Sequence, residues 1–298
     1  MKKAIITGST GLLGKCVSKY LLNRGIDTLC LGRQNLKPDE ISKIYGYSAR
    51  YICIRMEDIG SLAVRAKSIG WNVGEECVFF NFAWGGESSL TNGELSKQIE
   101  NAIHAASAVR IAKQMGCIKF INVGSLEETY ADLELKNKVS RDLSQMNYAI
   151  SKLASRDLCK LVAYLEKIDY IHTRHSAPIS VDLSNGGFIT KTILAIKNGA
   201  PFERPINKKL FDIISTDDVA KAFFDIGVHG INKRDYFIGS SMPTTLDNFF
   251  TNIELLLQGK ATVFSSCKSP IDSIFDTKIL KNDTGFSVKK NIYELLCL

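Results

Sequence analysis

Three side chains in the middle of the sequence have the chemistry to move a proton at a carbonyl or alcohol oxygen. Tyr148 and Lys152 are four residues apart, a spacing that puts both on one face of a helix. A lysine beside a tyrosine favours the phenolate and lowers the pKa of the phenol, which makes Tyr148 a general acid or base near neutral pH. Ser125 follows an apolar run, and its hydroxyl can donate to the same substrate oxygen. We therefore predict that Ser125, Tyr148 and Lys152 are catalytic; a serine that only shapes a turn is the alternative for Ser125.

A glycine motif near the N-terminus predicts a site for a dinucleotide. Gly8, Gly11 and Gly14 follow the apolar run Lys3–Thr7 and precede a helical pattern. Glycines at such a junction allow a tight turn, close approach of backbone amides to a pyrophosphate, and close packing of the helix on the sheet. The predicted cofactor-binding residues here are Gly8, Ser9, Thr10, Gly11, Leu12 and Leu13.

The residues after the second and third expected strands bear on which dinucleotide binds. A site for NAD usually has Asp or Glu after the second strand, but this chain has Gly32 and Arg33. A guanidinium pairs with a 2′-phosphate, so NADP(H) is the expected cofactor and NAD(H) is the alternative; a solvated surface arginine is the other interpretation. Asp58 and Ile59 are expected at the adenine, although Asp58 could instead cap the next helix.

The elements that must position these residues alternate between strand and helix. The strand candidates are short apolar runs without alternation, as expected for strands buried on both faces. Helical patterns lie between them, which predicts βαβ units and a parallel sheet. The expected strands are Lys3–Thr7, Thr28–Leu31, Tyr51–Ile54, Cys77–Phe82, Lys119–Val123 and Tyr170–Arg174, and the expected helices Gly11–Arg24, Ile59–Ser68, Glu94–Met115 and Asn147–Lys167.

The pattern changes near residue 175, where most of the prolines begin. We expect a doubly wound α/β domain of the Rossmann type over residues 1–175 and a smaller, closely packed, mixed substrate lobe over 176–298. The elements expected in this lobe are helices at Phe188–Lys197, Asp217–Gly227, Leu246–Gln258 and Lys289–Leu296, and strands at Phe211–Ser215 and Tyr236–Ile238.

Composition narrows the class of protein. The 298 residues carry a net charge of +7, spread along the chain, which suits an anionic cofactor or substrate without requiring nucleic acid. Apolar runs are too short for a membrane-spanning helix, and the first apolar run is too short for a signal peptide. The cysteines form no metal-binding pattern. We expect a cytoplasmic protein with reduced thiols and no bound metal.

The glycine loop, the serine at a strand end and the Tyr-x-x-x-Lys pair resemble the short-chain dehydrogenase/reductase superfamily. The resemblance is closer to its extended branch, the NAD-dependent epimerase/dehydratase family, which acts on nucleotide-diphosphate sugars. Thr216–Ala220 and Asp276–Leu280 are similar to late motifs of that family. The resemblance implies that Phe82, Ala83, Trp84, Asn101, Tyr148 and Lys152 contact the cofactor. It also implies a homodimer paired through Glu94–Met115 and Asn147–Lys167.

Departures from the family pattern concern the substrate. No Asp-Glu pair follows Ser125 in the register of the family's dehydratases, which disfavours dehydration. Phe211 replaces an arginine that pairs with the diphosphate, and the segment after Arg174 lacks an asparagine that meets the sugar nucleotide. The residues expected to contact substrate are Trp84, Glu127, His175, Arg204 and Lys208, against the alternatives of core packing for Trp84 and His175 and solvation for the charged residues.

These observations favour one reaction over its rivals. The leading hypothesis is NADPH-dependent reduction of a nucleotide-diphosphate 4-keto-6-deoxy sugar. The first alternative is a nucleotide-sugar 4-epimerase with tightly bound NAD, and a distant one is a non-enzymatic module that senses NADP. Arg33 argues against the epimerase, because recycling hydride within one site does not need the NADPH pool.

Overall fold

The computed structural model describes residues 1–74, 76–86, 94–136, 146–184, 186–206, 209–260 and 272–296. The chain divides into two compact units. The larger unit comprises Met1–Arg174 and Phe223–Tyr236, and the smaller one His175–Ala222 and Phe237–Leu298. A single domain boundary near residue 175 does not account for residues 223–236, which belong to the larger unit.

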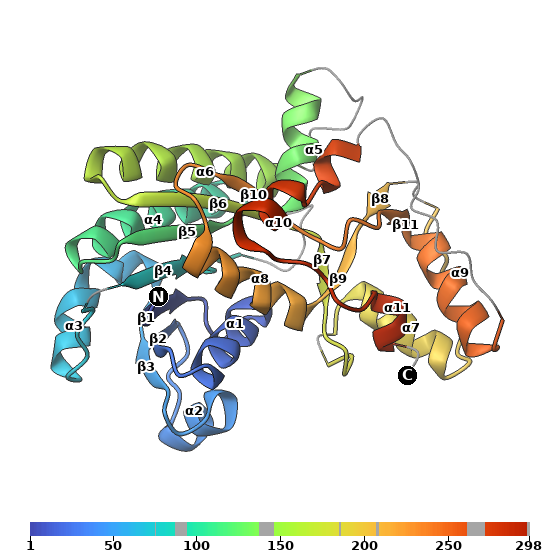
Figure 1. Ribbon diagram of the computed structural model, residues 1–298, viewed down its shortest axis with the longest axis horizontal. Helices are drawn as coiled ribbons and strands as arrows, with labels where there is room; N and C mark the ends of the chain where they lie inside the picture. Colours follow the sequence, from blue (N-terminus) through green and yellow to red (C-terminus); the bar gives the residue numbers. More distant parts are fainter. Residues whose placement is uncertain are drawn as a thin grey trace. The chain divides into compact units, whose positions relative to one another are not determined.

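A seven-stranded parallel sheet forms the centre of the larger unit, in the order β10-β6-β5-β4-β1-β2-β3 (Figure 1). The order reverses between β1 and β4, so helices cover both faces, as expected for a doubly wound fold of the Rossmann type. All six strands expected before residue 175 are present. The strands are β1 (Lys3–Thr7), β2 (Asp27–Gly32), β3 (Arg50–Cys53), β4 (Cys77–Asn81), β5 (Lys119–Val123), β6 (Asp169–His175) and β10 (Asp235–Ile238).

The helices of the larger unit include two that the sequence patterns did not predict, α2 and α5. Ser125 and Glu128 form a capping box at the start of α5, which satisfies the orphan amides of its first turn. The apolar residues of this segment show little helical periodicity, so the capping box was the sequence signal that could have predicted this helix. The helices are α1 (Leu12–Asn23), α2 (Pro38–Tyr45), the 3₁₀ turn η1 (Met56–Ser61), α3 (Leu62–Ser68), α4 (Leu95–Gln114), α5 (Leu126–Leu135) and α6 (Asn147–Glu166).

The core of the larger unit lies between the sheet and the paired helices α4 and α6, which run side by side (Figure 1). Phe79 on β4 stacks on Phe120 of β5 with ring centroids 5.1 Å apart, and Phe120 stacks in turn on Tyr170 of β6. These rings fix the spacing of adjacent strands from one face, which sets where the strand ends emerge.

The smaller unit is a mixed α/β structure with its own core, in which Ile193, Phe249 and Phe250 are fully buried. The expected strand Tyr236–Ile238 pairs with β6 as β10 of the seven-stranded sheet, and the boundary between the two units falls within it, after Tyr236. None of the helices in the described parts of the chain is long and apolar enough to cross a membrane. The remaining elements are β7 (Ala177–Ile179), α7 (Phe188–Lys197), β8 (Leu210–Phe211), β9 (Ile213–Ser215), α8 (Thr216–His229), β11 (Thr244–Thr245), α9 (Leu246–Leu257), the 3₁₀ turn η3 (Asp272–Phe275), α10 (Lys278–Thr284) and α11 (Ile292–Leu296).

A buried lysine ties the returning segment to the sheet. The Nζ atom of Lys119, at the start of β5, donates to the carbonyl oxygens of Ile226, Gly227 and Gly230 at 3.5, 3.3 and 2.8 Å. These carbonyls lie at the end of α8, where a cation is favoured by the helix dipole. Burial lowers the pKa of Lys119, with Asp169 acting in the opposite direction.

Replacing Lys119 with methionine should lower the free energy of unfolding by about 1–3 kcal/mol, because the carbonyls lose their donor while the volume is kept. Urea unfolding of both proteins measures the difference. Lys67→Met, at an exposed position of α3, is the matched control and should change the free energy of unfolding by no more than about 0.5 kcal/mol. Equal midpoints for all three proteins would show that Lys119 does not anchor the segment.

Candidate active site

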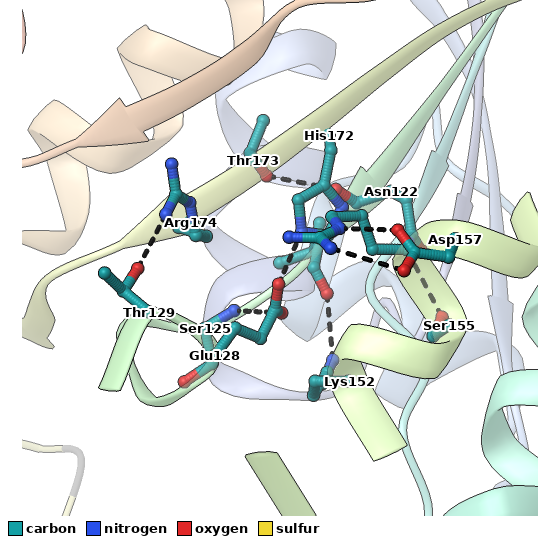
Figure 2. A network of polar contacts seen from close by, with 12 residues as sticks. Asn122, Ser125, Glu128, Thr129, Lys152, Ser155, Asp157, His172, Thr173 and Arg174 are labelled. Carbon is teal, nitrogen blue, oxygen red and sulfur yellow. Dashed lines mark hydrogen bonds and ion pairs between the residues drawn. The ribbon is translucent and has the colours of Figure 1, made fainter. Parts of the chain in front are cut away.

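The structure brings Ser125, Tyr148 and Lys152 together at the carboxyl end of β5. Ser125 is the N-cap of α5, and its hydroxyl forms a hydrogen bond with the phenol of Tyr148 in the first turn of α6. Lys152 lies one turn further along α6, with its Nζ atom 5.8 Å from the centroid of the Tyr148 ring. Nζ donates to the carbonyl oxygen of Val123 at 2.8 Å (Figure 2). The four-residue spacing therefore places both side chains on one face of α6, as the sequence predicted.

Burial sets the protonation of both groups. It raises the pKa of Tyr148 to about 12; the hydrogen bond with Ser125 lowers it, and the carboxylates of Glu128 and Glu127 raise it. The lowering by Lys152 that the sequence predicts does not appear. Burial also lowers the pKa of Lys152 to about 8, against the effects of Glu128 and Cys159, which raise it. Tyr148 is consequently a neutral phenol at physiological pH.

Trp84 covers the lysine. The Lys152 Nζ atom is 3.8 Å from the centroid of the Trp84 ring, a distance for a cation–π contact, and the Tyr148 ring meets Trp84 edge-on at 5.9 Å. The indole nitrogen donates to Oε1 of the buried Gln98 on α4 at 2.7 Å. The side chain of Asn101 holds the next peptide, accepting from the Gly85 amide at 2.7 Å and donating to its carbonyl oxygen at 2.8 Å. Trp84 is thus fixed from α4 as a wall of the site.

Buried polar side chains connect the strand ends that carry these loops. Thr7 on β1 donates to Asn81 on β4 at 2.7 Å, and Asn81 donates to Asn122 on β5 at 3.0 Å. Asn122 donates in turn to Ser155 on α6 at 3.3 Å. Thr7 also accepts from the backbone amide of Ala83 at 3.2 Å. The row aligns the glycine loop, the Trp84 loop and α6.

A cavity of about 520 Å³ adjoins Trp84, and the glycine loop forms part of its wall. Gly8 has a positive φ of 63°, and a Cβ atom there would lie 2.8 Å from the amide nitrogen of Ala83. A Cβ atom on Gly14 would lie 2.2 Å from the Gly8 carbonyl oxygen. Only glycine fits either position. No side chain in the described part of the chain caps the start of α1, so the amides of Leu12 and Leu13 can bind an anion. The cavity therefore fits a dinucleotide.

Two arginines line the other end of the cavity, and each comes shortly after a strand of the sheet. Arg33 follows β2 and Arg55 follows β3, and both line the cavity with Met56. Asp58 and Ile59, predicted at the adenine, are not among the lining residues. Ile59 is buried in the core, and Asp58 is exposed on η1. The cavity is lined by residues 54–57, immediately after β3; the prediction placed the contact further along the chain.

The remaining predicted cofactor residues have separate places. Thr10, Gly11, Phe82, Ala83 and Asn101 line the cavity. Ser9 is fully buried and accepts a hydrogen bond from the Tyr45 hydroxyl at 3.0 Å, so its side chain supports the loop from behind.

The predicted substrate residues also differ in their surroundings. Glu127 is half-buried in the first turn of α5, close enough to Tyr148 to raise its pKa. His175, in the smaller unit, has its Nδ1 atom 2.8 Å from the carbonyl oxygen of Ser176. The guanidinium of Arg204 pairs with Asp247 and Glu254 on α9, so an anionic substrate would compete with two carboxylates. Lys208 lies outside the described residues.

Sequence reasoning missed Arg55, Gln98 and the Glu128–His172 contact. Arg55 follows the end of β3 closely, and residues directly after a parallel strand line the ligand edge of such sheets, so its position was the available signal. No local sequence signal marked Gln98 or His172, because each depends on a partner far away in the chain. Gln98 is 14 residues from Trp84, and His172 is 44 residues from Glu128.

Comparison with solved structures supports the fold over nearly the whole chain. A UDP-glucose 4-epimerase from Thermotoga maritima, solved with UDP-glucose, has a TM-score of 0.75 at 17% identity and covers 99% of this chain and 96% of its own. A dTDP-glucose 4,6-dehydratase from Bacillus anthracis, solved with NAD, has a TM-score of 0.74 at 16% identity, covering 100% and 94%. The enzyme WbmF from Bordetella bronchiseptica, solved with NAD⁺ and UDP, has a TM-score of 0.72 at 17% identity, covering 99% and 90%. At identities this low, the structural likeness establishes a shared fold and nothing more specific.

Sequence comparison gives the family. A search of curated protein sequences finds no significant match. The model of the NAD dependent epimerase/dehydratase family matches residues 4–239, a span that includes the glycine loop, Ser125 and the Tyr148–Lys152 pair. The chain therefore belongs to the NAD dependent epimerase/dehydratase family.

Proposed function

We propose that this protein reduces the keto group of a nucleotide-diphosphate 4-keto-6-deoxy sugar with NADPH. The observation that carries the proposal is the neutral phenol of Tyr148, hydrogen-bonded to Ser125 beside the dinucleotide cavity. A reductase needs a proton donor at the oxygen that gains negative charge, and the protonated phenol of Tyr148 can fill that role.

The residues divide the work at the substrate oxygen. When bound, a nicotinamide dinucleotide would supply the hydride that the carbonyl carbon needs. Tyr148 donates its phenolic proton to the oxygen, and the Ser125 hydroxyl donates a hydrogen bond to the same atom. Lys152 stabilises the developing charge electrostatically and binds ribose hydroxyls. Trp84 excludes water from the ammonium by covering it.

Two arginines support the preference for NADP(H). Arg33 and Arg55 follow adjacent strands and line the adenosine end of the cavity, where family members with NAD place a carboxylate after the second strand. Arg33 is exposed, and Arg55 contacts only the exposed Glu57 among the described residues, at 3.4 Å. Two guanidiniums at one edge suit the dianionic 2′-phosphate.

The alternative reaction is 4-epimerisation with tightly bound NAD, which uses the same three residues in both directions. The likeness to a UDP-glucose 4-epimerase supports it. Dehydration is disfavoured because no Asp-Glu pair follows Ser125 in the register of the family's dehydratases, and Glu128 is fully buried against His172. We also propose a cytoplasmic location.

We further propose a homodimer formed through α4 and α6. Leu158, Leu161 and Leu165 are exposed on α6 at helical spacing, and Leu95 and Ile103 are exposed on α4. Five exposed large apolar side chains on two adjacent helices form a surface that a second copy of the same surface would bury in a four-helix arrangement.

Tyr148→Phe should reduce turnover by ~10²–10⁴-fold, because phenylalanine has the same shape without the proton. The measurement is NADPH oxidation at 340 nm with a panel of nucleotide 4-keto sugars. Dinucleotide affinity should stay within about twofold of the parent protein, since the ring is kept. Wild-type turnover in this variant would mean that another group is the acid. If the panel gives no reduction but interconversion of UDP-sugars occurs, the epimerase alternative is correct.

Arg33→Asp should lower the ratio of NADPH to NADH affinity by about tenfold or more, and Arg55→Gln should lower it in the same direction, because each loses a charge-assisted bond to the 2′-phosphate. Fluorescence titration with each dinucleotide measures the ratio. Lys43→Asp on α2, exposed and outside the cavity lining, is the charge control. An unchanged ratio in both arginine variants would contradict the NADP preference.

Leu161→Glu with Leu165→Glu should convert a dimer of about twice 33.0 kDa into a monomer of 33.0 kDa, because each carboxylate would be desolvated in the interface. Light scattering at micromolar concentration measures the mass. Val64→Glu, exposed on α3, should leave the dimer intact. A parent protein that is already monomeric would refute the proposal.

A further inference from the structure

A buried carboxylate–imidazole pair lies next to Ser125, and the reaction proposed above assigns it no role. The Oε2 atom of Glu128 is 2.7 Å from Nε2 of His172, and neither side chain has any exposed surface. The Oε1 atom accepts from the backbone amide of Ser125 at 2.8 Å (Figure 2). An ionised carboxylate only accepts, so His172 carries a proton on Nε2. Glu128 therefore links the imidazole to the backbone of the catalytic serine.

The backbone is shaped around this pair. A Cβ atom on Gly124 would lie 2.2 Å from Oε1 of Glu128 and 2.5 Å from Nε2 of His172. The Gly124 amide donates to the Thr173 carbonyl oxygen at 2.7 Å, which holds the end of β5 against β6. A side chain at residue 124 would displace the pair, so glycine is required there for contact rather than for its φ angle.

The charge of Glu128 reaches both proton-handling groups. Burial raises the pKa of Glu128, but His172, Lys152 and the Ser125 amide together lower it further, so the net direction is down. In turn, Glu128 raises the pKa of Tyr148 and that of Lys152. The titratable and charged groups around this cluster are His172 and Tyr170 on β6, Tyr148, Lys152, Arg156 and Cys159 on α6, Glu127 on α5 and Asp235 on β10.

We propose that Glu128 and His172 are a positioning pair for the reductase reaction: His172 orients Glu128, and Glu128 fixes the Ser125 backbone and holds a negative charge near the Lys152 ammonium. The inference rests on the proposed function. Burial favours the neutral form of Lys152. A fixed anion nearby opposes this effect and helps the ammonium to persist, and Glu128 is that anion.

The test is Glu128→Gln, which keeps the shape and an acceptor for the Ser125 amide but removes the charge. The pKa values of Tyr148 and Lys152 should both fall. The alkaline limb of kcat/KM for reduction should therefore move to lower pH by about one unit. Asp132→Asn removes a charge from the exposed face of the same helix and should leave the limb in place. Coincident profiles for Glu128→Gln and the parent protein would overturn the proposal.

A second measurement needs no substrate. Because Lys152 lies against the Trp84 ring, its loss of charge should change Trp84 emission, isolated as the difference from Trp84→Phe. The midpoint of this titration should lie at about 8 in the parent protein and fall by about one unit in Glu128→Gln. If the midpoint shifts while no sugar on the panel is reduced, the proposed reaction is wrong and the electrostatic role of the pair stands. An unshifted midpoint overturns the role of the pair whether or not the protein turns over.

Gly124→Ala tests the same geometry without removing a charged group. The new Cβ atom displaces Glu128 and His172, so the fluorescence midpoint should fall in the same direction as in Glu128→Gln. This variant also covers the case in which Glu128→Gln does not fold. A folded Gly124→Ala protein that binds NADPH and has the parent midpoint would contradict the proposal.

Discussion

The arrangement of the site depends on a row of buried hydrogen bonds across three strand ends. Thr7, Asn81 and Asn122 occupy corresponding places on β1, β4 and β5, and each polar side chain has its partner on the neighbouring strand. A polar group left unpaired at this depth would cost about 1–3 kcal/mol, so the row allows only one alignment of the strand ends. The loops that follow these strands bind or react, and their relative positions derive from this alignment.

Burial then gives the site its chemistry. The same low-dielectric surroundings that raise the pKa of the Tyr148 phenol lower that of the Lys152 ammonium. Both shifts work against proton donation. A phenol with a raised pKa gives up its proton less readily, and a lysine that loses its charge provides no positive charge beside the donor. Glu128 opposes the loss of charge on Lys152, and Trp84 accepts the ammonium with its ring face. The site therefore combines a buried neutral phenol with a buried lysine whose pKa is lowered to about 8.

The dinucleotide cavity follows a different logic, since backbone rather than side chains shapes it. Gly8 and Gly14 are required by close approaches of the main chain at the β1–α1 turn. This requirement is local in sequence, so the motif was readable before the structure. The arginine that follows β3 was not recognised, although the expected strand Tyr51–Ile54 ends directly before it and within one residue of the observed strand end.

The sequence by itself determined the parallel sheet, the glycine loop and the grouping of Ser125 with Tyr148 and Lys152. Each rests on short-range spacing: apolar runs buried on both faces, glycines at a strand–helix junction and a pair four residues apart on one helix. Tertiary structure alone decided what those groups contact. His172 meets Glu128, Gln98 holds Trp84, and residues 223–236 return to the larger unit. Such contacts join segments distant in the chain, and no local pattern encodes a partner that only folding brings within hydrogen-bond distance. The direction of the Tyr148 pKa was decided in the same way, because burial is a property of the packed protein rather than of the motif.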